Sequence, residues 1–206
     1  MAVTSPPPPP PDADVVKRHR IVVVAGHNGD QNAVEAHLGD PDAIVRQAAL
    51  SALYRLGACT TDHIRTAIAD PAPRVRARAS ELAVHVDGIT PAALLDDPDS
   101  SVVEVTCFAC GEVSWPTGTA PVAQLSAIAT GHDDALCRES AAAALGAIGD
   151  PAGLDAVLAA CADRVTVRRR ATLALAAFDD PRADQALHSA LDDKDWQVRQ
   201  AAEDLL

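Results

Sequence analysis

A helical pattern that recurs about every 30 residues is the feature that most constrains the fold of this 206-residue chain. In the clearest copy, an apolar residue stands before an arginine, and small or apolar residues follow it at offsets 4, 7, 8 and 11. These residues are Val45, Ala49, Ala52, Leu53 and Leu56. Because an α-helix turns once in about 3.6 residues, this spacing places all of them on one face of a helix.

The pattern occurs seven times. Regular copies begin at Val45, Val75, Cys137 and Val167, a partial copy begins at Val198, and degraded copies begin at Val16 and Val103. Shorter apolar stretches lie between the copies, as in 150–162 and 180–191, and begin with an Asp-Pro pair that is typical of a helix start. Hairpins of this kind must stack to bury their apolar faces. The sequence therefore predicts an all-α solenoid of about six helical hairpins plus a terminal half-repeat.

The frame D-P-x-x-x-V-R-x-x-A-x-x-A-L-x-x-L-G-D-P resembles the HEAT-like repeats first described in phycobilisome lyases, over about residues 14–206. The resemblance implies a right-handed α-α superhelix whose arginine-bearing helices line the concave face. It also implies a ladder in which a turn aspartate and an arginine six positions later link successive repeats. The pairs with this spacing are Asp40 and Arg46, Asp70 and Arg76, and Asp193 and Arg199. Asp163 with Arg168 and Asp133 with Arg138 are one residue shorter, and Glu104 stands where the fourth arginine is expected.

The first 13 residues are predicted to form a disordered, proline-rich tail, and residues 14–206 to form the solenoid. Six consecutive prolines, Pro6 to Pro11, favour a polyproline II spacer, with docking on an aromatic groove as the alternative. No secretory signal and no apolar run of about 18 residues is found, so we expect a cytoplasmic protein without a membrane span. Five cysteines in such a chain are expected to remain reduced thiols.

Catalytic and cofactor sites are not predicted. The hydroxylase branch of the resembling superfamily binds di-iron through His-Glu dipeptides, and this sequence has none. Cys107 and Cys110 could be half of a zinc or redox motif, but no second pair follows, and small buried core residues are the favoured interpretation. Paired aspartates lie at helix boundaries, where capping explains them. We expect a non-enzymatic protein without metal or cofactor.

Nucleic-acid binding is disfavoured by charge. The formal net charge is −12, and no basic stripe interleaved with aromatic residues is present. The basic clusters are 168–170 and the alternating arginines of 74–78, which are expected to be solvated helix faces and members of the ladder.

The favoured function is a protein-interaction scaffold or adaptor that uses the concave face. The alternative is an accessory chaperone or subunit of a modifying enzyme of the bilin-lyase type. The sequence leaves the oligomeric state, the partner and the pathway open.

Charge locates the expected partner site. Residues 87–163 contain twelve acidic residues and one basic residue, so this stretch holds −11 of the net charge. Most of these acids lie at turns, but Glu104, Glu112 and Glu139 are expected on the arginine-bearing helices. We therefore expect an acidic middle of the groove that binds a basic or cationic segment of a protein, with Trp115 at its rim in the inserted loop 114–118 and Tyr54 as a further contact.

The N-terminal helix has a second unusual feature. Counted from Val16, Ile21 and Val22 fall at offsets that face outward in a regular repeat. An apolar outer face on a terminal repeat is expected to be covered by the tail, a second copy or a partner.

Overall fold

The computed structural model describes residues 12–206, and every element of secondary structure within them is helical. The predicted tail, residues 1–13, lies outside the described residues except for Asp12 and Ala13. Asp12 caps the first helix, which begins at Ala13.

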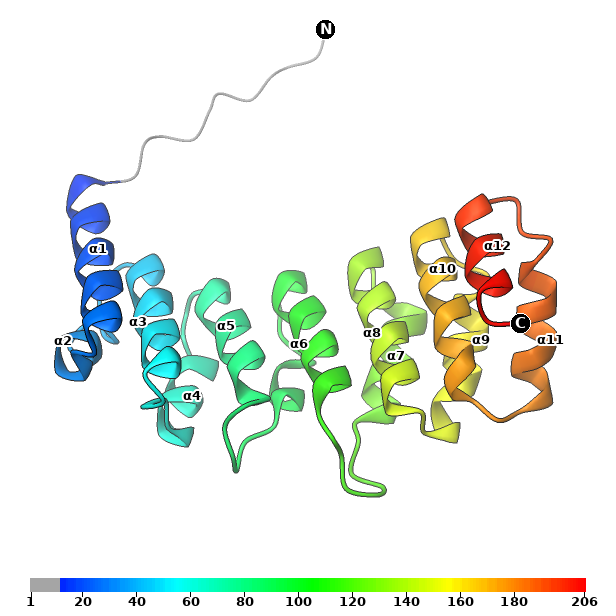
Figure 1. Cartoon of the computed structure of the whole chain (residues 1–206), viewed down its shortest axis with the longest axis horizontal. Helices are drawn as coiled ribbons and strands as arrows, with labels where there is room; N and C mark the ends of the chain where they lie inside the picture. Colours follow the sequence, from blue (N-terminus) through cyan, green and yellow to red (C-terminus); the bar gives the residue numbers. More distant parts are fainter. Residues whose placement is uncertain (1–11) are drawn as a thin grey trace, which may run out of the picture.

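Seven helices form one row and carry the repeated pattern (Figure 1). They are α1 (Ala13–Asn28), α3 (Ala43–Arg55), α5 (Pro73–Ala83), α6 (Ser100–Glu112), α8 (Ala135–Ile148), α10 (Val165–Ala174) and α12 (Trp196–Glu203). We call them the anchor helices. They stand side by side, with α1 and α12 at opposite ends of the molecule.

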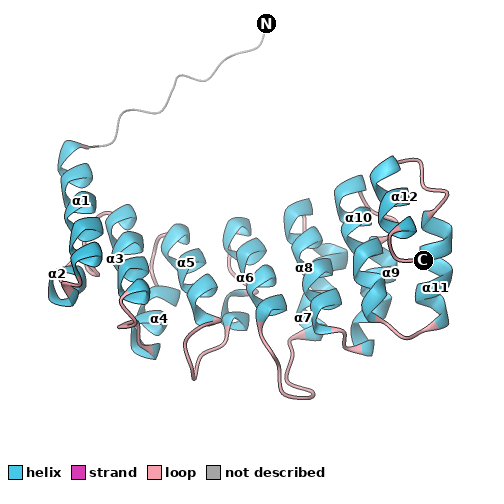
Figure 2. Ribbon diagram, in the orientation of Figure 1, coloured by secondary structure: helices cyan, strands magenta, loops and turns pink. Residues whose placement is uncertain are grey.

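Six further elements connect the anchor helices and form a second row (Figure 2). They are α2 (Gln31–Glu35), α4 (Thr61–Ile68), the 3-10 helix η1 (Pro91–Leu94), α7 (Val122–Gly131), α9 (Leu154–Ala160), which follows the 3-10 turn η2 (Pro151–Gly153), and α11 (Pro181–Ala190). A third 3-10 turn, η3 (Leu175–Ala177), extends α10. The prediction of six hairpins and a terminal half-repeat in an all-α solenoid is confirmed.

Aspartates at the turns start most anchor helices. The side chains of Asp42, Asp99, Asp134 and Asp195 each accept a hydrogen bond from the backbone N–H two residues further on. These bonds satisfy donors that a helix start leaves without a partner. At least part of the acidity of the middle of the chain therefore serves helix capping.

The core consists of one repeated set of buried positions on the anchor helices. Counted from an anchor residue, offsets 0, 4, 5, 7 and 8 are buried, and in α3 they are Val45, Ala49, Leu50, Ala52 and Leu53. The same offsets are buried in α5, α8 and α10, counted from Val75, Cys137 and Val167. The regular copies of the sequence pattern thus predict the inward offsets 0, 4, 7 and 8 correctly. Offset 5, expected to face outward, is buried in all four regular copies, so that expectation is wrong.

The two degraded copies are shifted by one residue from the prediction. In α6 the buried set starts at Val102 rather than Val103. In α1, Val22 is fully buried and corresponds to offset 5 from Lys17, so the prediction that Val22 faces outward is wrong. Ile21 is 43% exposed as expected, and Val16, Val23 and Val24 share its exposure. The turn aspartates and their arginines set the phase of these helices, and the apolar residues alone do not reveal it.

Arginine and aspartate side chains link successive repeats in a ladder. Each arginine donates from Nε and Nη2 to both carboxylate oxygens of an aspartate. This aspartate lies in the turn that leads to the next anchor helix. The linked pairs are Arg18 and Asp40, Arg46 and Asp70, Arg76 and Asp97, Arg138 and Asp163, and Arg168 and Asp193. Arg199, in the last helix, donates to the backbone carbonyl of Asp193 at 2.6 Å. Such bidentate, charge-assisted bonds fix both distance and orientation between repeats.

The ladder is interrupted between α6 and α8. The place of the arginine is taken by Val103, which is buried next to the anchor Val102, so Glu104 does not replace the ladder arginine as expected from the sequence. The place of the next aspartate is taken by His132, whose Nδ1 accepts the N–H of Asp134 at 3.0 Å. Asp133, expected in the ladder, contributes only its backbone carbonyl to Arg138.

Removal of one ladder arginine should be strongly destabilising. In the pair of Arg76 and Asp97 the side chains are only 12% and 3% exposed. Arg76→Met leaves the Asp97 carboxylate buried without its cation, which should lower the free energy of unfolding by about 3 kcal/mol. Arg65→Met is the matched control, because Arg65 pairs with Asp62 in an ion pair whose side chains are 63% and 88% exposed. Urea titration measures both, and equal losses for the two variants would contradict a structural role of the ladder.

Acidification should weaken the ladder. Hydrogen bonds from Arg138 and Arg168 lower the pKa of Asp163 and Asp193 below the ordinary aspartate value. A carboxyl whose pKa is lower in the folded state stabilises the fold above its unfolded pKa of about 3.9, and this contribution is lost as the pH falls through the folded pKa. The urea midpoint should therefore drop between about pH 5 and pH 2. The drop should be smaller in Arg168→Met, and an identical pH profile for that variant would argue against the assignment.

Candidate interaction groove

A groove between α5 and α6 gathers charged and aromatic side chains on the anchor-helix row. Its volume is about 490 Å³. The polar and aromatic residues that line it are Tyr54 from α3, Arg78, Glu81 and His85 from α5 and the turn after it, and Glu104, Phe108 and Glu112 from α6. We call this the α5–α6 groove.

One wall of the groove is a stripe along α6. Glu104, Phe108 and Glu112 are four residues apart, so they lie above one another on one face of the helix. Phe108 is 61% exposed, although the chain contains only two phenylalanines, two tryptophans and one tyrosine. We call these three residues the α6 stripe. It presents an apolar ring between two carboxylates.

The opposite wall is held in place by its own hydrogen bonds. Arg78 donates from Nε to the Ser51 hydroxyl at 2.8 Å and from Nη1 to Glu81 at 2.6 Å. The rings of Tyr54 and His85 stack with their centroids 5.4 Å apart. This wall is therefore preorganised, and the charge of Glu81 is balanced by Arg78.

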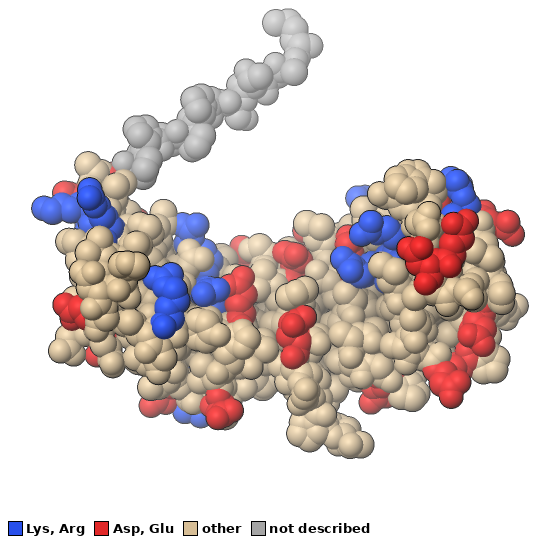
Figure 3. Space-filling view, in the orientation of Figure 1, with Lys and Arg blue, Asp and Glu red and all other residues tan. Residues whose placement is uncertain are grey.

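The carboxylates on the anchor helices differ in their partners. Glu139 lies 3.7 Å from the Arg170 guanidinium, and Glu81 is paired with Arg78. Glu104 and Glu112 form no ion pair within residues 12–206. Figure 3 shows acidic side chains in the middle of this face with basic side chains on either side of them, and further acidic side chains at the right-hand end. The negative potential of the groove therefore comes mainly from the α6 stripe.

The structure brings together three of the five residues expected from the sequence to bind a partner. Tyr54, Glu104 and Glu112 line the α5–α6 groove. Glu139 lies on α8 and is paired with Arg170, so it is not part of this groove. Trp115 does not lie on its rim either, because its indole N–H donates to the Cys110 carbonyl at 2.8 Å and its ring packs against the core.

Phe108 and His85 were not predicted. Phe108 is an aromatic residue at offset 6 from Val102, where the regular copies have serine, glutamate, alanine or leucine, and this signal is present in the sequence. The proximity of His85 to Tyr54 could not be read from spacing, because it depends on how far α5 lies from α3.

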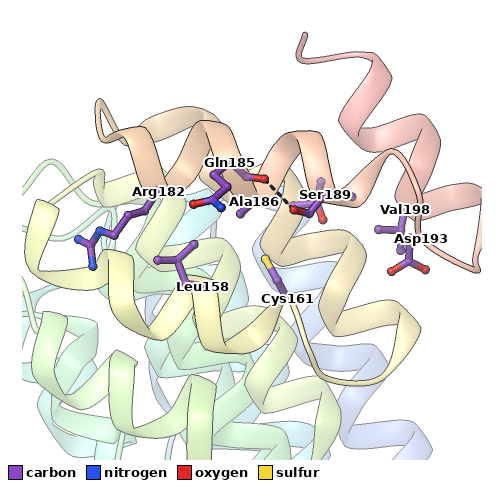
Figure 4. A pocket seen from close by; sticks show the side chains of 10 residues that line it. Leu158, Cys161, Arg182, Gln185, Ala186, Ser189, Asp193 and Val198 are labelled. Atoms are coloured by element: carbon purple, nitrogen blue, oxygen red, sulfur yellow. Dashed lines mark hydrogen bonds between the residues drawn. The ribbon is translucent and has the colours of Figure 1, made fainter.

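A second depression lies between α9 and α11, with a volume of about 460 Å³ (Figure 4). Most of its polar side chains already have partners. Arg182 pairs with Asp155 and Asp180, Ser189 bonds to the carbonyl of Gln185, and Asp193 belongs to the ladder. Among its charged side chains, none is left without an ion pair to recognise a charged ligand.

Three of the cysteines, Cys107, Cys110 and Cys137, are buried within the repeats, and Cys59 and Cys161 are half-buried. All five are free, and within residues 12–206 no group of three or more His, Cys, Asp or Glu side chains is arranged to hold a metal ion. Burial raises the pKa of the Cys110 thiol to about 12 and that of the Cys161 thiol to about 11. With these pKa values both thiols are protonated at neutral pH. They are therefore unreactive, because the thiolate is the form that attacks and that binds metal.

No helix within residues 12–206 has both the length and the apolar character needed to cross a bilayer.

Comparison with protein families and solved structures gives the following matches. The family of HEAT repeats matches residues 91–176, and the PBS lyase HEAT-like repeat matches residues 167–193. No curated protein sequence matches the chain.

Three solved structures are similar in helix arrangement. Human deoxyhypusine hydroxylase in complex with glycerol is 20% identical, with a TM-score of 0.48 over 94% of this chain and 79% of that chain. An engineered protein is 19% identical, with a TM-score of 0.46 over 91% and 85%. A designed armadillo repeat protein is 15% identical, with a TM-score of 0.46 over 94% and 93%.

Replacement of the buried cysteines tests whether they serve only packing. Cys107 and Cys110 occupy offsets 5 and 8 from Val102, and the residue equivalent to Cys110 is Leu53 in α3 and Leu145 in α8. Cys110→Ala should therefore leave a small void and cost about 1 kcal/mol of unfolding free energy, with Cys107→Ala costing no more. Urea titration measures this loss. Stoichiometric zinc in protein purified without added metal, abolished by the double substitution, would contradict the packing role.

Proposed function

The chain belongs to the HEAT-like repeat family, and we propose that it is a non-enzymatic scaffold whose α5–α6 groove binds a cationic segment of a partner protein. Repeat solenoids of this kind offer an extended surface on which outward side chains are free of the core. The proposal assigns recognition to the outward side chains of α3, α5 and α6.

The observation that carries the proposal is the exposed Phe108 between two carboxylates without ion-pair partners. An exposed aromatic ring costs solvation free energy unless something covers it. A guanidinium or ammonium group can pair with each of the two carboxylates, and apolar parts of the same segment can cover the ring between them. A cationic segment of a protein therefore satisfies all three residues of the α6 stripe.

The non-enzymatic part of the proposal is supported by the roles that the reactive residue types already have. The aspartates at the turns cap helices or accept ladder arginines, and the buried thiols are held protonated. A polar constellation with nucleophile, base and orienting group does not occur in the α5–α6 groove, whose acids are Glu81 on α5, paired with Arg78, and Glu104 and Glu112 about two turns apart on α6.

Site-directed photo-crosslinking tests the proposal. A benzophenone amino acid at position 108, expressed in the native cell, should capture a partner through a segment that contains lysine or arginine. Glu104→Lys with Glu112→Lys should abolish capture, because the reversed charges repel such a segment. Circular dichroism should show an unchanged helical fold, since both side chains lie on the surface of α6.

The matched control is Asp192→Lys with Glu203→Lys, which changes the net charge equally at exposed residues of the last repeat, outside the groove lining. Capture should persist in this variant and should decrease with added salt, because exposed charges are screened over about 8 Å at physiological ionic strength. Capture that is unchanged by the reversal in the α6 stripe, or crosslinks that map to neutral or acidic segments, would overturn the proposal.

A further inference from the structure

The α6 stripe has a length that restricts which cationic segment can match it. Glu104 and Glu112 are eight residues apart on one helix, which at 1.5 Å per residue separates them by about 12 Å, with Phe108 midway. A ligand that pairs with both carboxylates must carry two positive charges at about this distance.

An extended peptide meets this requirement. Its residues advance by about 3.3 Å, and residues i, i+2 and i+4 point to the same side, so i and i+4 are about 13 Å apart. Basic residues at i and i+4 then reach the two carboxylates, and the residue at i+2 lies over the Phe108 ring.

A helical ligand can present charges at the same distance, but it is too wide to enter the groove. The helices α5 and α6 pack directly against each other, with the hydroxyls of Ser80 and Thr106 in contact between them. Because packed helix axes lie about 8–10 Å apart, the space between the outward side chains of α5 and α6 is narrower than a helix of about 10–12 Å diameter. A single extended strand with inward side chains is the better fit.

The ligand residue at i+2, which lies over Phe108, is expected to be apolar rather than cationic. Arg78 lines the same groove, and its guanidinium is already satisfied by Ser51 and Glu81. The groove therefore has two unpaired carboxylates, and a third basic residue would face Arg78 without an acid to receive it. Phe108 and the Tyr54–His85 pair favour an apolar side chain at this position.

We infer that the α5–α6 groove recognises an extended segment with basic residues at positions i and i+4 and an apolar residue at i+2. This inference rests on the proposed function and deepens it, because it specifies the register of the cationic segment. Glu104 and Glu112 each take one basic side chain, and Phe108 takes the apolar side chain between them.

Synthetic peptides test the register. The matched probe is a fluorescent nine-residue peptide of serine and glycine with arginine at its third and seventh positions and leucine at its fifth. Control peptides of the same composition place the two arginines next to each other, or three positions apart. Fluorescence anisotropy at low salt should show about tenfold tighter binding of the matched peptide, as expected when one of two charge-assisted contacts is lost in the controls.

Variants of the protein assign the contacts. Glu104→Gln and Glu112→Gln should each reduce the preference for the matched peptide without changing the fold. Phe108→Ala should remove the preference for leucine over serine at the central position while leaving the preference for arginine spacing. Ser126→Ala, a substitution on α7 outside the groove, should leave binding of all peptides unchanged.

The outcomes separate the two proposals. Equal binding of all arginine arrangements would overturn the register and leave the cationic groove standing. Tighter binding of a stapled helical peptide with arginines eight positions apart would overturn the extended conformation. Binding of basic peptides no tighter than a neutral peptide of equal length at low salt would overturn both.

Discussion

Close contact between neighbouring anchor helices is the constraint on which the rest of the structure depends. A Cβ atom added to Gly146 would lie 2.6 Å from the Cβ of Ala174, and one added to Gly26 would lie 2.8 Å from the Cβ of Ala52. At such distances only glycine fits at positions 26 and 146, and the alanines opposite them are small enough for the helix backbones to approach each other. Because alanine buries little apolar surface, the stability of the stack depends on this dense packing and on the polar ladder at the turns.

Contacts between neighbouring anchor helices also fix the shape of the α5–α6 groove. The Arg76 ion pair with Asp97 links the starts of α5 and α6, and the buried hydroxyls of Ser80 and Thr106 meet at 2.9 Å between the two helices. These two contacts fix the distance between the walls of the α5–α6 groove. On the other side of α6, where Val103 and His132 interrupt the ladder, Gly111 instead permits close packing, since its added Cβ would lie 3.2 Å from the Cα of Ala144. The stripe on α6 is therefore carried by a helix that is packed on both sides.

The regular repeats could be predicted almost completely from sequence, because the apolar offsets and the turn aspartates give the same helix phase in α3, α5, α8 and α10. The two degraded copies could not be phased, since valines at 102 and 103 and at 22 to 24 fit either of two registers. Only the arginine-aspartate geometry decides between them. This is why Arg18 was missed as the partner of Asp40, and why Glu104 was placed at the ladder position. The expected acidic site was partly correct, but whether a carboxylate is balanced depends on the neighbouring helix, as Glu139 and Arg170 show.

Position within the repeat explains why the fold was easier to predict than the function. Inward offsets are restricted by packing, so their residue types repeat. The outward offset occupied by Phe108 is Ser51 in α3, Glu81 in α5, Ala143 in α8 and Leu173 in α10, a set with no common chemistry. Because the stack places no requirement on this offset, an aromatic residue there contributes little to folding and remains exposed. Agreement among the copies reveals the fold. The candidate binding surface is located by the opposite signal, because one copy differs from the others at a position that packing does not restrict.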